Sequence, residues 1–183
     1  MRKMPEILAT ATVARTRLFH VESVDLRFAN GVEVQYERLR SSSGGAVLIV
    51  PMLDDDTVLL IREYSAGVHR YELGLPKGRI EAGEDLLLAA NRELMEEVGY
   101  GARSLEHLTA FSLSPSYMNH QTQIVLARDL FVQTAEGDEP EQIEVVPWKL
   151  SQLAILLRRD DCTEARSIAA LIMVRELLAE GSA

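Results

Sequence analysis

Residues 78–100 place a glycine-bearing loop directly before a short helix whose last turn is crowded with acidic side chains. Residues 85–98 contain no Gly or Pro and are rich in Leu, Ala, Glu and Met, so their composition predicts one helix. Gly99 follows at the place where a left-handed residue commonly ends a helix. At about 100° per residue, three carboxylates lie along one edge of the apolar stripe of this helix: Glu93, Glu96 and Glu97.

This acidic edge predicts a bound cation. Like charges at this spacing destabilise an isolated helix by about a few tenths of a kcal/mol per pair, and the helix dipole also disfavours anions near its C-terminus. A metal ion reverses both effects. Oxygen ligands without a neighbouring Cys or His favour Mg²⁺, with Mn²⁺ as a substitute, and Mg²⁺ commonly shares its coordination with substrate phosphates. The alternative is a solvated acidic face, but the fixed order of Gly78, Glu84, Arg92 and the acids argues against it.

That order resembles the signature of the Nudix hydrolase superfamily. Pro115, sixteen residues after Gly99, is typical of its ADP-ribose pyrophosphatase branch. Within this branch the chain is similar to a subgroup of ADP-compound hydrolases over nearly its whole length. The similar segments are VARTRLFHVESVDLRFANGVEVQYERLR (13–40), LLIREYSAGVHRYELGLPKG (59–78), LSPSYMNH (113–120) and EGDEPE (136–141).

The resemblance implies an α/β fold, namely an α/β/α sandwich with a mixed sheet. It also implies Mg²⁺-dependent hydrolysis of the pyrophosphate bond in ADP-ribose, diadenosine polyphosphates or NADH, with release of AMP. Two alternatives stay open. The chain could be a Nudix pyrophosphatase for another nucleotide, such as a sugar nucleotide or coenzyme A, or a non-catalytic Nudix module that binds a nucleotide.

The resemblance also implies roles for individual residues. Glu93 and Glu97 correspond to the main metal ligands, Glu96 to a further ligand or a base, and the carbonyl of Lys77 completes such a site. Four residues of the motif are implied to be structural: Gly78, Glu84, Arg92 and Gly99. A catalytic base commonly comes from a later loop in this branch, where Glu139 and then Glu141 are our candidates. The alternative for each is a solvated acidic loop.

Substrate phosphates need cations, and Arg62 is the first candidate because a planar guanidinium suits phosphate. Arg40 and Arg79 are the next candidates, and an ordinary surface arginine is the alternative for all three. Glu72 is a candidate for a ribose hydroxyl, although related enzymes often have Ala where Lys77 stands and a shorter spacing from this acid. Tyr36 and Phe19 are candidates to stack on adenine, with a core role as the alternative for each.

Apolar and polar residues alternate on both sides of Asn30-Gly31, which predicts a hairpin. We therefore expect residues 1–43 to form an antiparallel sheet for dimerisation and adenosine contacts, and residues 44–183 to form the Nudix domain. The apolar runs 46–53 and 57–61 flank three consecutive acids and predict a buried hairpin with a solvated turn. Asp161-x-x-Glu164 predicts a capping box before a C-terminal helix.

Composition restricts the partners and the location. The net charge of −9 argues against nucleic acid as a partner. No apolar run approaches about 18 residues, so no membrane span is expected. Cys162 is the only cysteine, which fits a reducing cytoplasm. Related ADP-ribose hydrolases exchange their N-terminal region between subunits, so the resemblance implies a homodimer.

Overall fold

The computed structural model describes residues 2–41, 44–137 and 139–180, and the chain divides into two compact units. The first unit combines Met1–Ser43 with Ser112–Gln121, and the second combines Gly44–Phe111 with Thr122–Ala183. Residues 112–121 join the N-terminal segment in the first unit, so the division of the chain into 1–43 and 44–183 stays a prediction. Ser42 and Ser43, which adjoin that division, lie outside the described residues.

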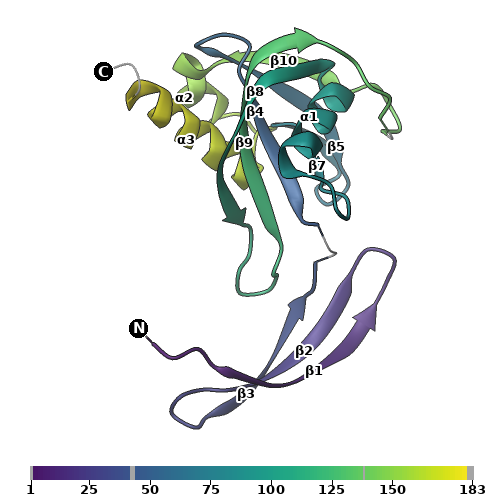
Figure 1. Ribbon diagram of the computed structural model, residues 1–183, viewed down its shortest axis with the longest axis vertical. Helices are drawn as coiled ribbons and strands as arrows, with labels where there is room; N and C mark the ends of the chain where they lie inside the picture. The colour runs from purple at the N-terminus through teal and green to yellow at the C-terminus, as the bar shows by residue number, and fades with distance from the viewer. Residues whose placement is uncertain (1, 42–43, 138, 181–183) are drawn as a thin grey trace. The chain divides into compact units, whose positions relative to one another are not determined.

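The first unit is an antiparallel sheet with the strand order β1-β2-β3 (Figure 1). Its strands are β1 (Glu6–Arg15), β2 (His20–Arg27) and β3 (Glu33–Leu39). The hairpin predicted around Asn30-Gly31 is confirmed: the Asn30 side chain accepts a hydrogen bond from the Val32 amide at 3.1 Å, and Gly31 has a φ of 83°. Residues 112–121 of the same unit are joined to β3 by a hydrogen bond, in which the Leu39 amide donates to the Tyr117 carbonyl at 2.7 Å.

The second unit contains two sheets. A mixed sheet has the order β7-β4-β9-β8, in which β4 runs antiparallel to β7 and parallel to β9. Its strands are β4 (Ala46–Pro51), β7 (Lys77–Arg79), β8 (Tyr100–Ser112) and β9 (Gln121–Val132). An antiparallel sheet has the order β10-β5-β6. Its strands are β5 (Thr57–Ser65), β6 (Arg70–Gly74) and β10 (Glu144–Lys149).

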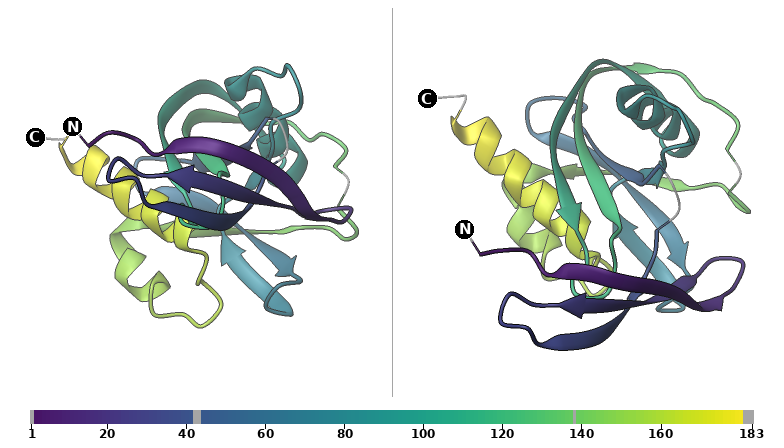
Figure 2. Two further views of the ribbon diagram at one scale, coloured as in Figure 1. Left: turned by 90° about the horizontal axis from the view of Figure 1, so that it is seen from below. Right: turned by 60° about the horizontal axis from the view of Figure 1, so that its bottom comes forward.

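Helices cover both faces of the sheets in the second unit, as Figures 1 and 2 show. Successive residues of β4 point to opposite faces. Leu48 and Val50 pack in one core with the C-terminal helices, and Val47 and Ile49 pack in another with α1. The helices are α1 (Leu86–Glu97), the 3₁₀ turn η1 (Leu150–Gln152), α2 (Leu153–Leu156) and α3 (Ala165–Glu180). The predicted α/β sandwich with a mixed sheet is confirmed.

The predicted pairing of residues 46–53 with 57–61 is wrong. Strand β4 has β7 and β9 as its two neighbours, so both of its edges are occupied. The chain leaves β4 through a turn in which Asp54 accepts hydrogen bonds from the amides of Asp56 and Thr57, and only one bridge, Met52 to Val58, remains between the two runs. Strand β5 then enters the other sheet.

The predicted capping box at Asp161 is also wrong. Helix α3 begins at Ala165, and the Glu164 carboxylate accepts from the Ser167 amide at 2.8 Å. Asp161 instead binds the guanidinium of Arg62. None of the described helices is long and apolar enough to cross a bilayer.

Candidate active site

Helix α1 presents its acidic edge because its other side is fixed in the core. Asp85 caps the N-terminus by accepting hydrogen bonds from the Leu87 and Leu88 amides at 2.9 and 3.2 Å. Leu94 is completely buried in the core that contains β4. Glu93 and Glu97 follow the same edge and retain only 9% and 6% of their accessible surface. The helix ends as predicted, with Gly99 in the left-handed region at a φ of 77°.

Strand β7 lies directly against this acidic edge. The Lys77 amide donates to Oε2 of Glu97 at 2.8 Å. At Gly78, a Cβ atom would lie 1.9 Å from the carboxylate carbon of Glu93 and about as close to both of its oxygens. Only glycine therefore lets the strand backbone approach the Glu93 carboxylate this closely. The glycine of the motif is thereby tied to the acid fifteen residues later.

Arg92 holds the acidic groups in place. Its Nε and Nη2 donate to the two oxygens of Glu84 at 2.9 and 3.0 Å. Its Nη1 donates to Glu93 at 2.8 Å and to Glu96 at 3.0 Å. Nη2 also reaches the carbonyl of Arg79 at 2.9 Å. The hydrogen bonds that Arg92 donates to Glu84, and then those that it donates to Glu93, raise the pKa of Arg92 above its usual range.

Burial makes the two innermost acids unusual. It raises the pKa of Glu97 to about 8, against the opposing effects of the Lys77 amide and ammonium groups. Burial also raises the pKa of Glu93, although Arg92 acts in the opposite direction. The ionised form of a buried carboxylate with a raised pKa is stabilised by a positive charge placed next to it.

These groups meet in one pocket of about 730 Å³. Of the candidates from the sequence, the pocket is lined by Lys77, Gly78, Arg79, Arg92, Glu93, Glu96, Glu97 and Glu139. Glu136 and Gly137, from the loop between β9 and β10, also line it. Glu63 of β5 is a lining residue that sequence reasoning missed. Nothing in the sequence marks it beyond its place on a strand that precedes the motif.

An adjoining pocket of about 480 Å³ shares Glu96, Glu97 and Glu139 with the first. Glu141 lines this second pocket, and its carboxylate accepts a hydrogen bond from the Tyr71 hydroxyl at 2.6 Å. The loop that carries both candidate bases, Glu139 and Glu141, therefore contributes to the linings of both pockets.

Three of the predicted substrate contacts are absent from the linings of both pockets. Arg62 donates to Glu144 at 2.9 Å and to Asp161 at 2.6 Å, outside the lining of either pocket. Glu72 is buried against Thr163, whose amide and hydroxyl donate to it at 3.1 and 2.9 Å. Arg40 belongs to the first unit.

The donor set fits a divalent cation. No three acidic, His or Cys side chains among the described residues already converge to cage an ion, because Arg92 binds Glu93 and Glu96 and the Lys77 amide binds Glu97. Two buried carboxylates with raised pKa values nevertheless face a pocket without Cys or His in its lining. Close backbone approach at Gly78 leaves the Glu93 oxygens at the pocket wall. Hard oxygen donors of this kind suit Mg²⁺ or Mn²⁺.

Comparisons with known proteins agree with this geometry. Residues 5–38 match the NudE-type Nudix hydrolase N-terminal domain, and residues 43–171 match the NUDIX domain. The chain is 52% identical to the ADP compounds hydrolase NudE of Escherichia coli, over 95% of this chain and 93% of that protein. It is 28% identical to an ADP-ribose pyrophosphatase of Bacillus subtilis, over 90% and 91% of the two chains. A crystal structure of an ADP compounds hydrolase superposes with a TM-score of 0.92 at 50% identity, covering 99% of this chain and 97% of that one.

Proposed function

Because this chain belongs to the Nudix hydrolases, with an N-terminal domain of the NudE type, we propose that it hydrolyses the pyrophosphate bond of ADP-linked compounds and releases AMP. ADP-ribose, diadenosine polyphosphates and NADH are the proposed substrates. The observation that carries the chemistry is the single pocket lined by Glu93, Glu96, Glu97 and the loop acid Glu139. The similarity to two hydrolases named for ADP compounds and ADP-ribose directs this chemistry to ADP-linked substrates.

Nudix hydrolases generally work with a divalent metal, and we propose Mg²⁺ here, with Mn²⁺ as a substitute. Glu93 and Glu97 would hold the ion, with Glu96 and the carbonyl of Lys77 as further donors. When bound, such an ion neutralises charge on the phosphate oxygens and lowers the pKa of an attacking water. Glu139 is the proposed base, followed by Glu141, because both belong to the loop beside this pocket. Arg92 keeps Glu93 and Glu96 oriented toward the pocket.

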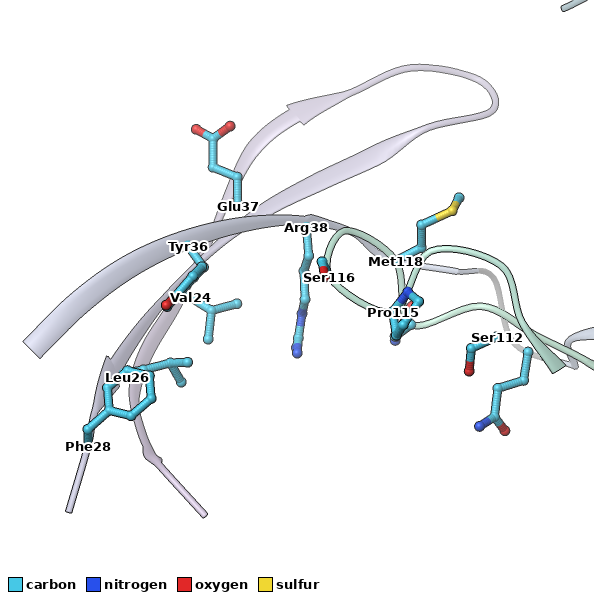
Figure 3. Close-up of a pocket in the computed structure, with 12 residues that line it drawn as sticks. Val24, Leu26, Phe28, Tyr36, Glu37, Arg38, Ser112, Pro115, Ser116 and Met118 are labelled. Atoms are coloured by element: carbon cyan, nitrogen blue, oxygen red, sulfur yellow. The ribbon is translucent and has the colours of Figure 1, made fainter. Parts of the chain in front are cut away.

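We propose Arg79 as a phosphate contact, because it lines the pocket. Arg62, Arg40 and Glu72 stay predictions as substrate contacts. The first unit has its own pocket of about 460 Å³, lined by Val24, Leu26, Phe28 and Tyr36 among others. Figure 3 shows Val24 and Arg38 on one side of the strands and Glu37 on the other. An apolar pocket with two aromatic rings suits an adenine ring, which supports the adenosine contacts that we propose for the N-terminal sheet.

We also propose a homodimer formed through the N-terminal sheet. Every residue of β1 is exposed. Large apolar side chains are exposed at Ile7 and Val13 of β1 and at Val34 of β3. Ile7 and Val34 both pair with Leu26, so exposed apolar side chains lie in one row across the sheet, which is typical of an interface. The cytoplasm is the proposed location, since the single cysteine, Cys162, is buried and unpaired.

The test is release of AMP from ADP-ribose in the presence of MgCl₂, with EDTA as the control. We expect rapid release that EDTA abolishes. Glu97→Gln should lower kcat by at least about 100-fold, since removing a metal ligand removes several kcal/mol of transition-state stabilisation. Preferential hydrolysis of a sugar nucleotide or coenzyme A in the same assay would contradict the ADP-compound assignment.

A further inference from the structure

The pocket that holds the signature acids is strongly negative. Its lining contains seven glutamates, which are Glu63, Glu81, Glu93, Glu96, Glu97, Glu136 and Glu139. Three cationic side chains face them: Lys77, Arg79 and Arg92. A substrate diphosphate is itself an anion, so metal ions alone leave it surrounded by carboxylates. A protein cation that binds the diphosphate directly offsets this repulsion, and we ask which cation can do so beside Arg79, the phosphate contact proposed above.

Arg92 is fully engaged. Its guanidinium donates to Glu84, Glu93 and Glu96 and to the carbonyl of Arg79. Arg62, the first candidate from the sequence, is bound to Glu144 and Asp161 outside the pocket lining. Withdrawing the Arg92 guanidinium would remove its hydrogen bonds to the partly buried carboxylates of Glu93 and Glu96, which is costly.

Lys77 is placed differently. Its Nζ atom binds Oε2 of Glu63 at 2.5 Å, and both side chains are a little over one quarter exposed. An ammonium group carries three donors, and this contact uses one of them. Strand β7 of the mixed sheet contributes the lysine and strand β5 of the other sheet contributes the acid. The ion pair therefore spans the two sheets at the wall of the pocket.

We infer that the Lys77 ammonium binds the diphosphate of the substrate, and that Glu63 holds this ammonium away from the metal-binding acids until the substrate arrives. The inference rests on the proposed function. The Lys77 amide donates to Glu97 at 2.8 Å, and Lys77, Glu63 and Glu97 all line the same pocket. Without Glu63, the lysine would be left beside the metal-binding acids of the same pocket, where it competes with a metal ion. Glu63 is thus a positioning residue and Lys77 a binding residue.

The first experiment measures binding of adenosine 5′-(α,β-methylene)diphosphate, which cannot be hydrolysed between its phosphates, by calorimetry in MgCl₂. Lys77→Ala should weaken binding about 10- to 100-fold, as expected for loss of a charge-assisted contact. Lys77→Arg should restore most of it. The matched control is Lys149→Ala, which removes a lysine bound to Thr57 and Asp54 outside the pocket lining and should change binding less than about twofold.

The second experiment tests Glu63 through a double-mutant cycle. The midpoint of thermal unfolding is followed against MgCl₂ concentration, which reports metal binding without turnover. Glu63→Gln should weaken apparent Mg²⁺ binding about 5- to 10-fold in the wild-type background, and less than about twofold in Lys77→Ala. Equal weakening in both backgrounds would overturn the positioning role, because it would reflect only the lost negative charge.

These outcomes separate the inference from the proposed function. If the wild type hydrolyses ADP-ribose but Lys77→Ala binds the methylene analogue as tightly, the inference fails alone. If ADP-ribose is not hydrolysed yet the analogue still requires Lys77, the proposed substrate fails and the inference stands. Circular dichroism of Lys77→Ala checks its folding, and Lys77→Gln replaces it if the alanine variant is unfolded.

Discussion

Glu97 is placed for function at the expense of stability. Burial raises its pKa from 4.5 to about 8, so the folded chain retains a proton that the unfolded chain has lost. Below pH 4.5 both states are protonated and this site costs nothing. Between pH 4.5 and 8 the unfolded state ionises first, so stability falls as the pH rises. In EDTA at pH 8, Glu97→Gln should therefore be more stable by on the order of 3 kcal/mol.

Urea denaturation at pH 4 and pH 8 measures this difference. The gain should nearly vanish at pH 4, and Glu106→Gln, an exposed acid on β8, should show no comparable gain at either pH. Adding MgCl₂ at pH 8 should stabilise the wild type more than Glu97→Gln, since the ion compensates the buried charge. A gain of equal size at both pH values would show that ionisation of Glu97 is not its source.

The absence of a side chain at Gly78 leaves room for the Glu93 carboxylate. In Gly78→Ala the new Cβ would lie about 2 Å from the Glu93 carboxylate, so the acid has to leave its position. A displacement near 1 Å in a catalytic group can lower the rate by about 100-fold, and we expect a loss in kcat of that size. Gly67→Ala is the control, because no atom lies within 4 Å of its Cβ position. Steady-state kinetics for both variants decide, and equal activity would refute the steric argument.

At the scale of elements, the loop between β9 and β10 is attached at both ends. At its start, the amides of Gln133 and Ala135 donate to the carbonyls of Gly99 and Met95. At its far end, the Tyr71 hydroxyl donates to Glu141 at 2.6 Å. Glu139, the first candidate base, lies between these attachments. Tyr71→Phe keeps the ring and releases the loop, so we expect kcat to fall about 5- to 10-fold while KM changes less.

Tyr64→Phe provides a matched control for that prediction. The Tyr64 hydroxyl binds Nδ1 of His69 at 2.6 Å within the same hairpin, and its ring packs edge-on against Tyr71. Tyr64→Phe therefore loses a hydrogen bond of similar length, but one that does not involve the loop between β9 and β10. If both variants lose activity equally, the effect belongs to the hairpin as a whole.

Some of these elements could be predicted from the sequence, and others could not. Helix α1 was predictable because composition, cap and terminating glycine all agree over one short segment. The pairing of β4 was not, because a strand buried on both faces carries no signal about its neighbours. Within the expected N-terminal sheet, strand β1 could not be delimited, since all its residues are exposed and no alternation marks a buried face.

Partners of charged side chains were harder to predict than the acids themselves. The spacing within α1 places Glu93 and Glu97 on one edge whatever surrounds the helix. The partners of Arg62 and Glu72 are Asp161 and Thr163, which lie about 90 to 100 residues further along the chain. Lys77 and Glu63 come from different sheets, so only the folded chain brings them together.

At the scale of the whole molecule, the N-terminal sheet presents surface that one chain leaves uncovered. Ile7, Leu26 and Val34 are paired across the three strands and form one row on the same face, and Ile7 and Val34 are exposed. If this row is the subunit interface, the wild type should have twice the chain mass of 20.4 kDa in light scattering, and Val34→Asp should be monomeric.

Val32→Asp is the control for the dimer, because Val32 is also exposed but lies beside the turn, outside the row. Burying an unpaired carboxylate at an apolar contact costs several kcal/mol, whereas an exposed one costs little. Only Val34→Asp should therefore dissociate the dimer, with circular dichroism showing that both variants are folded. A monomeric wild type, or a Val34→Asp variant that stays dimeric, would remove this row from the interface and leave its exposure without an explanation.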